Sequence, residues 1–158
     1  MTPEPAEHAR YRGYLEALSQ AAGPDESSVI AAVLGDPDQV MAEAAVLRHL
    51  DLRAARLDDD AAFTAWSRQV ATAIHGRELL ERRLREWSLS ADIDAGRPWS
   101  TADLGEASNW LQLRTAEHSR SHRALTVLAC QGRTRRIRSA AHERLDRADE
   151  PLARRSTQ

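Results

Sequence analysis

The chain has 158 residues, of which 42% are hydrophobic and 29% are charged. This balance is that of a globular protein with a sizeable core, so the composition excludes an intrinsically disordered chain. The sequence has no signal-peptide pattern and no run of about 18 apolar residues, which predicts a cytoplasmic protein without a membrane partner.

All 22 basic residues are arginine, because the sequence contains no lysine. This usage is typical of GC-rich, actinomycete-like coding, so the number of arginines is weak evidence for any ligand. Their distribution is more informative. Residues 1–119 carry twelve arginines and twenty acids, for a net charge of −8, whereas residues 120–158 carry ten arginines and four acids, for a net charge of +6. An acidic body with a basic end predicts electrostatic contact at that end.

Apolar residues recur at helical spacing from end to end, and no segment of five or more residues alternates as a strand would. The first helix is expected to end at Gly23-Pro24, and a short second helix over residues 27–34 closes at Gly35-Asp36-Pro37. The third is expected over residues 37–57. Its buried face is predicted to hold Val40, Ala44, Leu47, Leu50, Ala54 and Leu57.

The rest of the chain continues this helical pattern. The fourth helix should be capped by Asp58–Asp60, since negative charge suits the positive end of a helix. After a fifth helix, Ser100 should cap a sixth, which carries apolar residues from Leu104 to Leu113 and ends in the Ser-Arg-Ser-His stretch at residues 119–122. A short seventh helix ends at Gly132, and the eighth runs from a Thr134 cap to Pro151. The sequence thus predicts an all-α fold of about eight helices in antiparallel pairs. We expect one domain over residues 1–150 and a flexible tail at 151–158.

Two stretches share a more specific pattern of small alanines. VIAAVLGDPDQVMAEAAVLRHL has a short helix, an Asp-Pro turn and a helix that begins Val-x-x-x-Ala-Ala. ALTVLACQGRTRRIRSAAHERL has Ile137-Arg138-x-Ala140-Ala141-x-x-x-Leu145. Both resemble HEAT repeats, in which small residues let two helices approach closely. The resemblance covers about a third of the chain, and Met41 stands where the family carries arginine. It implies a stack of helix pairs, and an irregular helical bundle is the alternative.

Three other features have simple structural explanations. His118 and His122 are four residues apart, as two metal ligands on one helix would be, but a helix break is expected between them. The aspartates that precede the fourth helix lack the further Asp of diphosphate-binding signatures, which favours a cap. Cys130 is the only cysteine and lies in an apolar run, so we expect a buried, inert thiol. No metal site and no cofactor are expected.

Asp92 and Asp94 precede Gly96 in the clearest break of the chain. With Arg97 and Trp99 beside them, they could line a cleft in which a carboxylate pair does acid–base work. Such work needs pKa values shifted by burial or by a close neighbour, and acids in loops are usually solvated. A small helical enzyme with a cleft near Asp92–Trp99 is therefore only an alternative.

One segment of the basic C-terminal region, GRTRRIRSAAHERL at residues 132–145, is chiefly a packing helix. Arg133, Arg135 and Arg136 gather at its start, where the free backbone N–H groups of a helix also favour an anion. Trp99 either packs onto Leu104 as a hydrophobic staple or makes an exposed contact. These three arginines and Trp99 are the predicted partner-contact residues.

The sequence best fits a non-catalytic helical interaction or scaffold module of the bacterial cytoplasm, which binds a partner protein and has no catalytic residues. Nucleic-acid binding through the basic C-terminal helix is the first alternative, since HEAT-like repeats occur in one class of DNA-alkylation repair enzymes. No aromatic residue interleaves the arginines, so a stacking platform for bases is missing. The oligomeric state is left open.

Overall fold

The computed structural model describes residues 6–21 and 23–155, and side chains up to residue 148. Over these ranges it contains nine α-helices and no strand, which confirms an all-α fold of about eight helices. None of the described helices is both long and apolar enough to cross a membrane. The helices are α1 Ala6–Gln20, α2 Asp25–Leu34, α3 Gln39–Ala54, α4 Asp60–Ala73, α5 Glu78–Asp94, α6 Thr101–Glu106, α7 Asn109–His118, α8 His122–Gln131 and α9 Arg135–Arg155.

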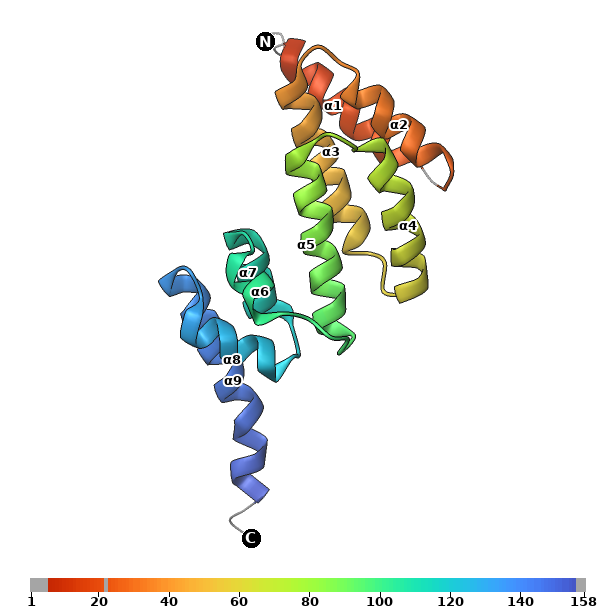
Figure 1. Cartoon of the computed structure of the whole chain (residues 1–158). Coiled ribbons are helices and arrows are strands. Elements are labelled where there is room, and N and C mark those ends of the chain that lie inside the picture. The colour runs from red at the N-terminus through yellow and green to blue at the C-terminus, as the bar shows by residue number, and fades with distance from the viewer. Residues whose placement is uncertain (1–5, 22, 156–158) are drawn as a thin grey trace. The chain divides into compact units, whose positions relative to one another are not determined.

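The chain divides into two compact units, residues 1–85 and 86–158, with the boundary inside α5 (Figure 1). In the first unit, α1 packs on α2 and α3, and α2 also packs on α3 and α4. In the second, α9 packs on α7 and α8, and α6 also contacts α8. Each unit is described by itself, and the single domain expected over residues 1–150 stays a prediction.

The buried face of α3 differs from the predicted one. Val40 is 83% exposed and Ala44 is also exposed, so both lie outside the core. The face that packs inward instead runs through Ala42, Ala45, Val46, His49, Leu50 and Ala54. The prediction is confirmed for Leu50 and Ala54 and was wrong for Val40 and Ala44. At the start of the helix the apolar residues allow two stripes, and the one that includes buried His49 faces inward.

The predicted sixth helix is two helices, since α6 ends at Glu106 and α7 begins at Asn109. Ser108 stands at the break and caps α7, its hydroxyl accepting a hydrogen bond from the Leu111 N–H at 3.3 Å. Its own N–H and hydroxyl donate to the two carboxylate oxygens of buried Glu86, at 2.8 and 2.9 Å. A carboxylate that binds both donors holds the chain in the extended conformation of a cap.

Three predicted helix caps are confirmed. Asp59 accepts from the Ala62 N–H at 2.7 Å at the start of α4. Ser100 accepts from the Ala102 N–H at 3.2 Å at the start of α6. Thr134 accepts from the Ile137 N–H at 3.2 Å before α9.

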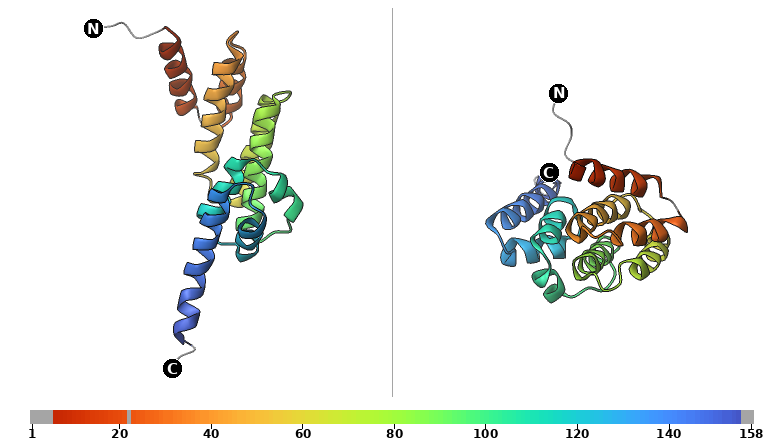
Figure 2. Two further views of the ribbon diagram at one scale, coloured as in Figure 1. Left: turned by 90° about the vertical axis from the view of Figure 1, so that its left-hand side faces the viewer. Right: turned by 90° about the horizontal axis from the view of Figure 1, so that it is seen from above.

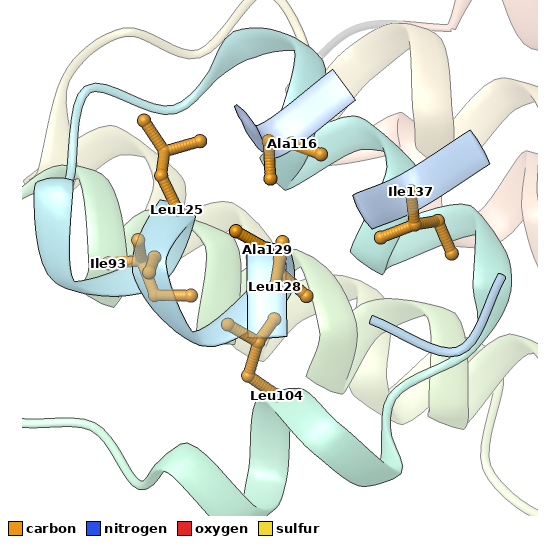
Figure 3. Close-up of a cluster of buried hydrophobic side chains, with 9 residues drawn as sticks. Ile93, Leu104, Ala116, Leu125, Leu128, Ala129 and Ile137 are labelled. Carbon is orange, nitrogen blue, oxygen red and sulfur yellow. The ribbon is translucent and has the colours of Figure 1, made fainter. Parts of the chain in front are cut away.

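The core of the second unit is built where α8 lies between α6 and α9. Figure 3 shows apolar side chains from these helices, from α7 and from the end of α5 meeting in one cluster. Its members are Ile93, Leu104, Ala116, Ala124, Leu125, Leu128, Ala129, Ile137 and Ala141. The alanines allow the close approach of helices that the repeat-like pattern requires.

Helix α9 is longer than the core that it covers. Ile137 and Ala141 are buried and Leu145 is partly buried, whereas Ala148, expected on the same face, is exposed. The helix continues to Arg155 and so passes Pro151, where the sequence predicted its end (Figure 2). Proline's fixed φ of about −65° is itself a helical value. Residues 156–158 of the expected tail lie outside the described residues, and its flexibility stays a prediction.

The turn between α8 and α9 has no room for a side chain at Gly132. A Cβ atom there would lie 2.5 Å from the Leu128 carbonyl oxygen and 2.8 Å from the Ile137 Cγ2. Both distances are far inside van der Waals contact, and one of the atoms belongs to the backbone. Gly132 is therefore required by close packing rather than by an unusual φ.

We expect Gly132→Ala to lower the free energy of unfolding by about 1–3 kcal/mol, since α8 and α9 must separate to admit the methyl group. The matched control is Gly105→Ala in α6, where a Cβ meets no atom within 4 Å. This change should be neutral or stabilise by up to about 1 kcal/mol, because alanine is the better helix former. Urea unfolding followed by circular dichroism measures both, and equal effects of the two changes would contradict the packing argument.

Candidate functional site

The first unit contains a buried carboxylate that joins three helices. Glu26, on α2, is only 1% exposed. Its Oε1 lies 2.7 Å from Nε2 of His49 on α3 and accepts a hydrogen bond from Nε1 of Trp66 on α4 at 3.0 Å. Arg53, one turn after His49, donates from Nε to Oε1 at 3.2 Å and from Nη2 to Oε2 at 3.3 Å. We call Glu26, His49, Arg53 and Trp66 the Glu26 cluster.

The charge of Glu26 is stabilised by its partners. Burial alone raises the pKa of this carboxyl, but the hydrogen bonds from His49, Trp66 and Arg53 outweigh it and hold the pKa at about 2. Glu26 is therefore an anion at neutral pH, and both of its oxygens accept hydrogen bonds from the protein. Its hydrogen bonds therefore cross-link α2, α3 and α4.

Sequence reasoning missed the Glu26 cluster. His49 and Trp66 were not among the predicted site residues, yet both bind the same Glu26 oxygen. The available signal was the spacing of His49 and Arg53, four residues apart on one face of α3. Their common partner lies 23 and 27 positions earlier in the chain, and only the fold brings it close.

The second unit holds the predicted contact arginines on a fixed turn. The buried side chain of Gln112, on α7, donates from Nε2 to the carbonyl oxygens of Leu104 and Gly105 at 3.0 and 2.9 Å. Its Oε1 accepts from the Arg133 N–H at 2.9 Å. The Gln112 amide thus ties the end of α6 to the turn between α8 and α9.

The side chains of Arg133, Arg135 and Arg136 are exposed on this turn, and we call the three residues the arginine corner. Arg136, with 76% of its side chain exposed, lies 3.4 Å from a Glu117 oxygen. Arg133 donates from Nη2 to the Glu106 carbonyl oxygen at 3.3 Å. Contacts of this length between exposed groups contribute less than about 1 kcal/mol each. The guanidinium groups are therefore held only loosely, although the backbone beneath them is fixed.

Two backbone N–H groups near the start of α9 are occupied within the protein. The N–H of Arg133 is bound by Gln112, and that of Ile137 by the Thr134 hydroxyl. Arg138 donates from Nη1 to the Gly132 carbonyl oxygen at 2.7 Å, so its guanidinium group binds the same turn. Any ligand of the arginine corner must therefore be recognised mainly by the guanidinium groups.

Trp99 does not belong to the arginine corner. It is half-buried against the cluster that contains Leu104, as the staple interpretation predicts, and the Arg123 guanidinium lies 4.6 Å from its ring centroid. Arg123 is in the first turn of α8, whereas Arg133 follows the last one. The ten residues of α8 span about 15 Å, so Trp99 and the arginine corner are two separate sites at opposite ends of this helix.

The carboxylates of the proposed enzymatic cleft have structural partners. Asp92 accepts from Arg97 Nε at 2.7 Å, and Asp94 accepts from the Ser119 hydroxyl at 2.9 Å. Neither contact joins the two acids in a shared site. Both acids lie in the last turn of α5 rather than in a loop, where Asp92 binds the loop that follows and Asp94 binds the residue that ends α7.

The helix break between His118 and His122 is confirmed, since α7 ends at His118 and Ser121 caps α8. Within the described part of the chain, no group of three or more histidine, cysteine or acidic side chains could hold a metal ion. The expectation for Cys130 was wrong, because this residue is exposed. The buried face of α8 is formed by its neighbours Ala124, Leu125, Leu128 and Ala129.

An open groove of about 490 Å³ lies on α1 and α2 of the first unit. Burial, together with the adjacent Asp36 carboxylate, raises the pKa of Tyr14, one of its lining residues, to about 12. The groove contains neither the Glu26 cluster nor any of the sequence-predicted contact residues. Its lining consists of Tyr14, Ala17, Asp25, Ser28, Val29, Ala32 and Val33.

No protein-family model, curated protein or solved structure matches the chain. The function must therefore be argued from the chain's own residues.

Glu26→Gln should lower the free energy of unfolding at pH 7 by about 3 kcal/mol, because it removes the charge that its three partners surround. The folded pKa of about 2 lies below the ordinary 4.5, so the unfolded chain takes up the proton first as the pH falls. The stabilisation is complete above about pH 5 and is lost as the pH falls towards 2.

Urea unfolding at pH 7, 5 and 3 measures this dependence. The wild-type chain should lose more stability between pH 5 and pH 3 than Glu26→Gln does. The control is Glu16→Gln, which changes an exposed carboxylate on α1 and should retain the wild-type pH dependence. Parallel pH profiles for the wild type and Glu26→Gln would show that Glu26 is not the group responsible.

Proposed function

We propose that the chain is a non-catalytic interaction module of the bacterial cytoplasm that binds a partner protein through the arginine corner. The observation that carries this proposal is a contrast within one short segment. The backbone at residues 132–134 is fixed by the Gln112 amide, by the close packing of Gly132 and by the Thr134 cap, while the exposed guanidinium groups belong to Arg133 in this turn and to Arg135 and Arg136 in the first turn of α9.

A fixed backbone favours binding because little conformational entropy is lost there when a partner docks. Arginine is enriched at protein interfaces, where its planar group makes several hydrogen bonds at once. The arginine corner combines both properties, which supports a contact role over a role in solvation alone.

We propose further that α2–α3 and α8–α9 are HEAT-like units. Each pair joins a ten-residue helix to a longer one through a turn that starts with glycine. Asp38 caps the second helix of the first pair, as Thr134 does in the other. Ala45 and Ala141 are fully buried at corresponding places after these caps, which supports close helix contact in both units.

The experiment is affinity capture from a native lysate of the source organism, with Arg135→Glu/Arg136→Glu compared with the wild type. Acidic residues suit the first turn of α9, so the double change should preserve the fold. We expect the proteins captured by the wild type to be retained after nuclease treatment. The double variant should capture at least tenfold less of them, which corresponds to a loss of about 1.4 kcal/mol or more of binding free energy.

The matched control is Arg48→Glu/Arg68→Glu, which reverses two exposed arginines of the first unit and should leave capture unchanged. Capture that is insensitive to the arginine corner would refute the proposed contact surface. Capture that disappears with nuclease would favour the nucleic-acid alternative instead.

A further inference from the structure

We infer that the arginine corner recognises a short acidic segment of a partner protein, one that presents two or three carboxylates together. This inference rests on the proposed function and specifies the chemistry of the partner. It is argued from the spacing of the guanidinium groups, from the weakness of their present contacts and from the acidic residues around them.

The spacing of the three arginines fits an acidic segment that carries several carboxylates along its length. Arg133, Arg135 and Arg136 lie within four consecutive positions, at the turn and in the first turn of α9. One helical turn advances about 5.4 Å, so the three side chains start from a small area. Arg133 reaches the Glu106 carbonyl oxygen before α7, and Arg136 reaches Glu117 in the last turn of that helix. A guanidinium group binds a carboxylate through two parallel N–H···O bonds, so an acidic segment could place one carboxylate on each arginine along its length.

The contacts that these arginines make within the chain are easily exchanged. The pair between Arg136 and Glu117 is long, at 3.4 Å, and its two side chains are 76% and 39% exposed. Arg133 binds a neutral carbonyl oxygen rather than a carboxylate. At Arg133 a partner carboxylate would replace a neutral acceptor with a charged one, at Arg136 it would replace a long ion pair with a shorter one, and the fixed turn would not have to move.

The surroundings of the arginine corner favour a short acidic segment over a polynucleotide. The Glu117 carboxylate lies beside Arg136, so the positive charge of the arginine corner does not continue unbroken along α7. Non-specific binding of DNA depends on the neutralisation of several successive phosphates. No aromatic residue interleaves the arginines, and Trp99 packs against Arg123 at the other end of α8, so the arginine corner offers no platform on which bases could stack.

The test is fluorescence anisotropy at about 50 mM salt with two labelled probes. One probe is an eight-residue peptide with four glutamates, and the other is a twelve-base-pair DNA duplex. We expect the full chain to bind the peptide, and Arg135→Glu/Arg136→Glu to weaken this binding about tenfold or more, as the loss of two charge-assisted contacts implies. Arg48→Glu/Arg68→Glu should change the affinity less than twofold, and the duplex should bind more weakly than the peptide.

A second variant, Arg135→Gln/Arg136→Gln, removes the two positive charges without adding negative ones, and it should weaken peptide binding in the same direction. Circular dichroism establishes that each variant is folded. Peptide binding that is absent, or equal in all variants, overturns the inference. If lysate capture still depends on the arginine corner, the proposed function stands while the acidic partner is rejected. Tighter binding of the duplex overturns the inference in favour of nucleic acid.

Discussion

The hydrogen bonds of the Gln112 side chain set the arrangement of the second unit. This amide is fully buried, and it satisfies the last carbonyl groups of α6 and the first N–H group of the turn before α9 at the same time. Carbonyl groups at the end of a helix have no partner inside the helix, so a buried helix end requires such a group. Replacing the amide by an apolar side chain would leave these buried groups unsatisfied, which is more costly than the loss of an exposed hydrogen bond. The position of the arginine corner thus depends on a residue that carries no charge.

The Glu26 cluster solves the corresponding problem in the first unit with a charged group. A single aliphatic side chain would pack there without specifying how α2, α3 and α4 meet, because apolar contacts are not directional. The carboxylate binds one donor from α4 and two side chains from α3, and each of these bonds has a required direction. Glu86 performs a similar role at the break before α7. Buried polar groups therefore define where the short helices of this chain begin, end and meet.

These groups also explain which parts of the structure could be predicted from the sequence. Helical periodicity and the caps at Asp59, Ser100 and Thr134 were readable because both depend on residues close together in the chain. The inward face of α3 was not, because the burial of His49 depends on Glu26, 23 residues earlier. The break at Ser108 was missed although Gly105 and the Ser108 cap are local signals, because the apolar stripe continues across it, and the bonds to Glu86 that hold it come from 22 residues away. The arginine corner was found from its charge, but the Gln112 bond that fixes it was not.

Arginine is the only basic residue of this chain, so the number of arginines cannot identify a binding surface. The hydrogen bonds of each guanidinium group show whether that arginine supports the fold or is available to a partner. Arg53 binds the buried Glu26, and Arg77 binds both the Leu34 carbonyl oxygen and Glu43. Arg144 closes the end of α7 through the carbonyl oxygens of Glu117 and Ser119, at 2.8 and 2.7 Å. Such bonds commit a guanidinium group to the fold, because removing it would leave a buried acceptor unsatisfied. The arginine corner differs in that its side chains touch only exposed groups while its backbone is fixed from below. A partner can engage these guanidinium groups without breaking any bond on which the fold depends.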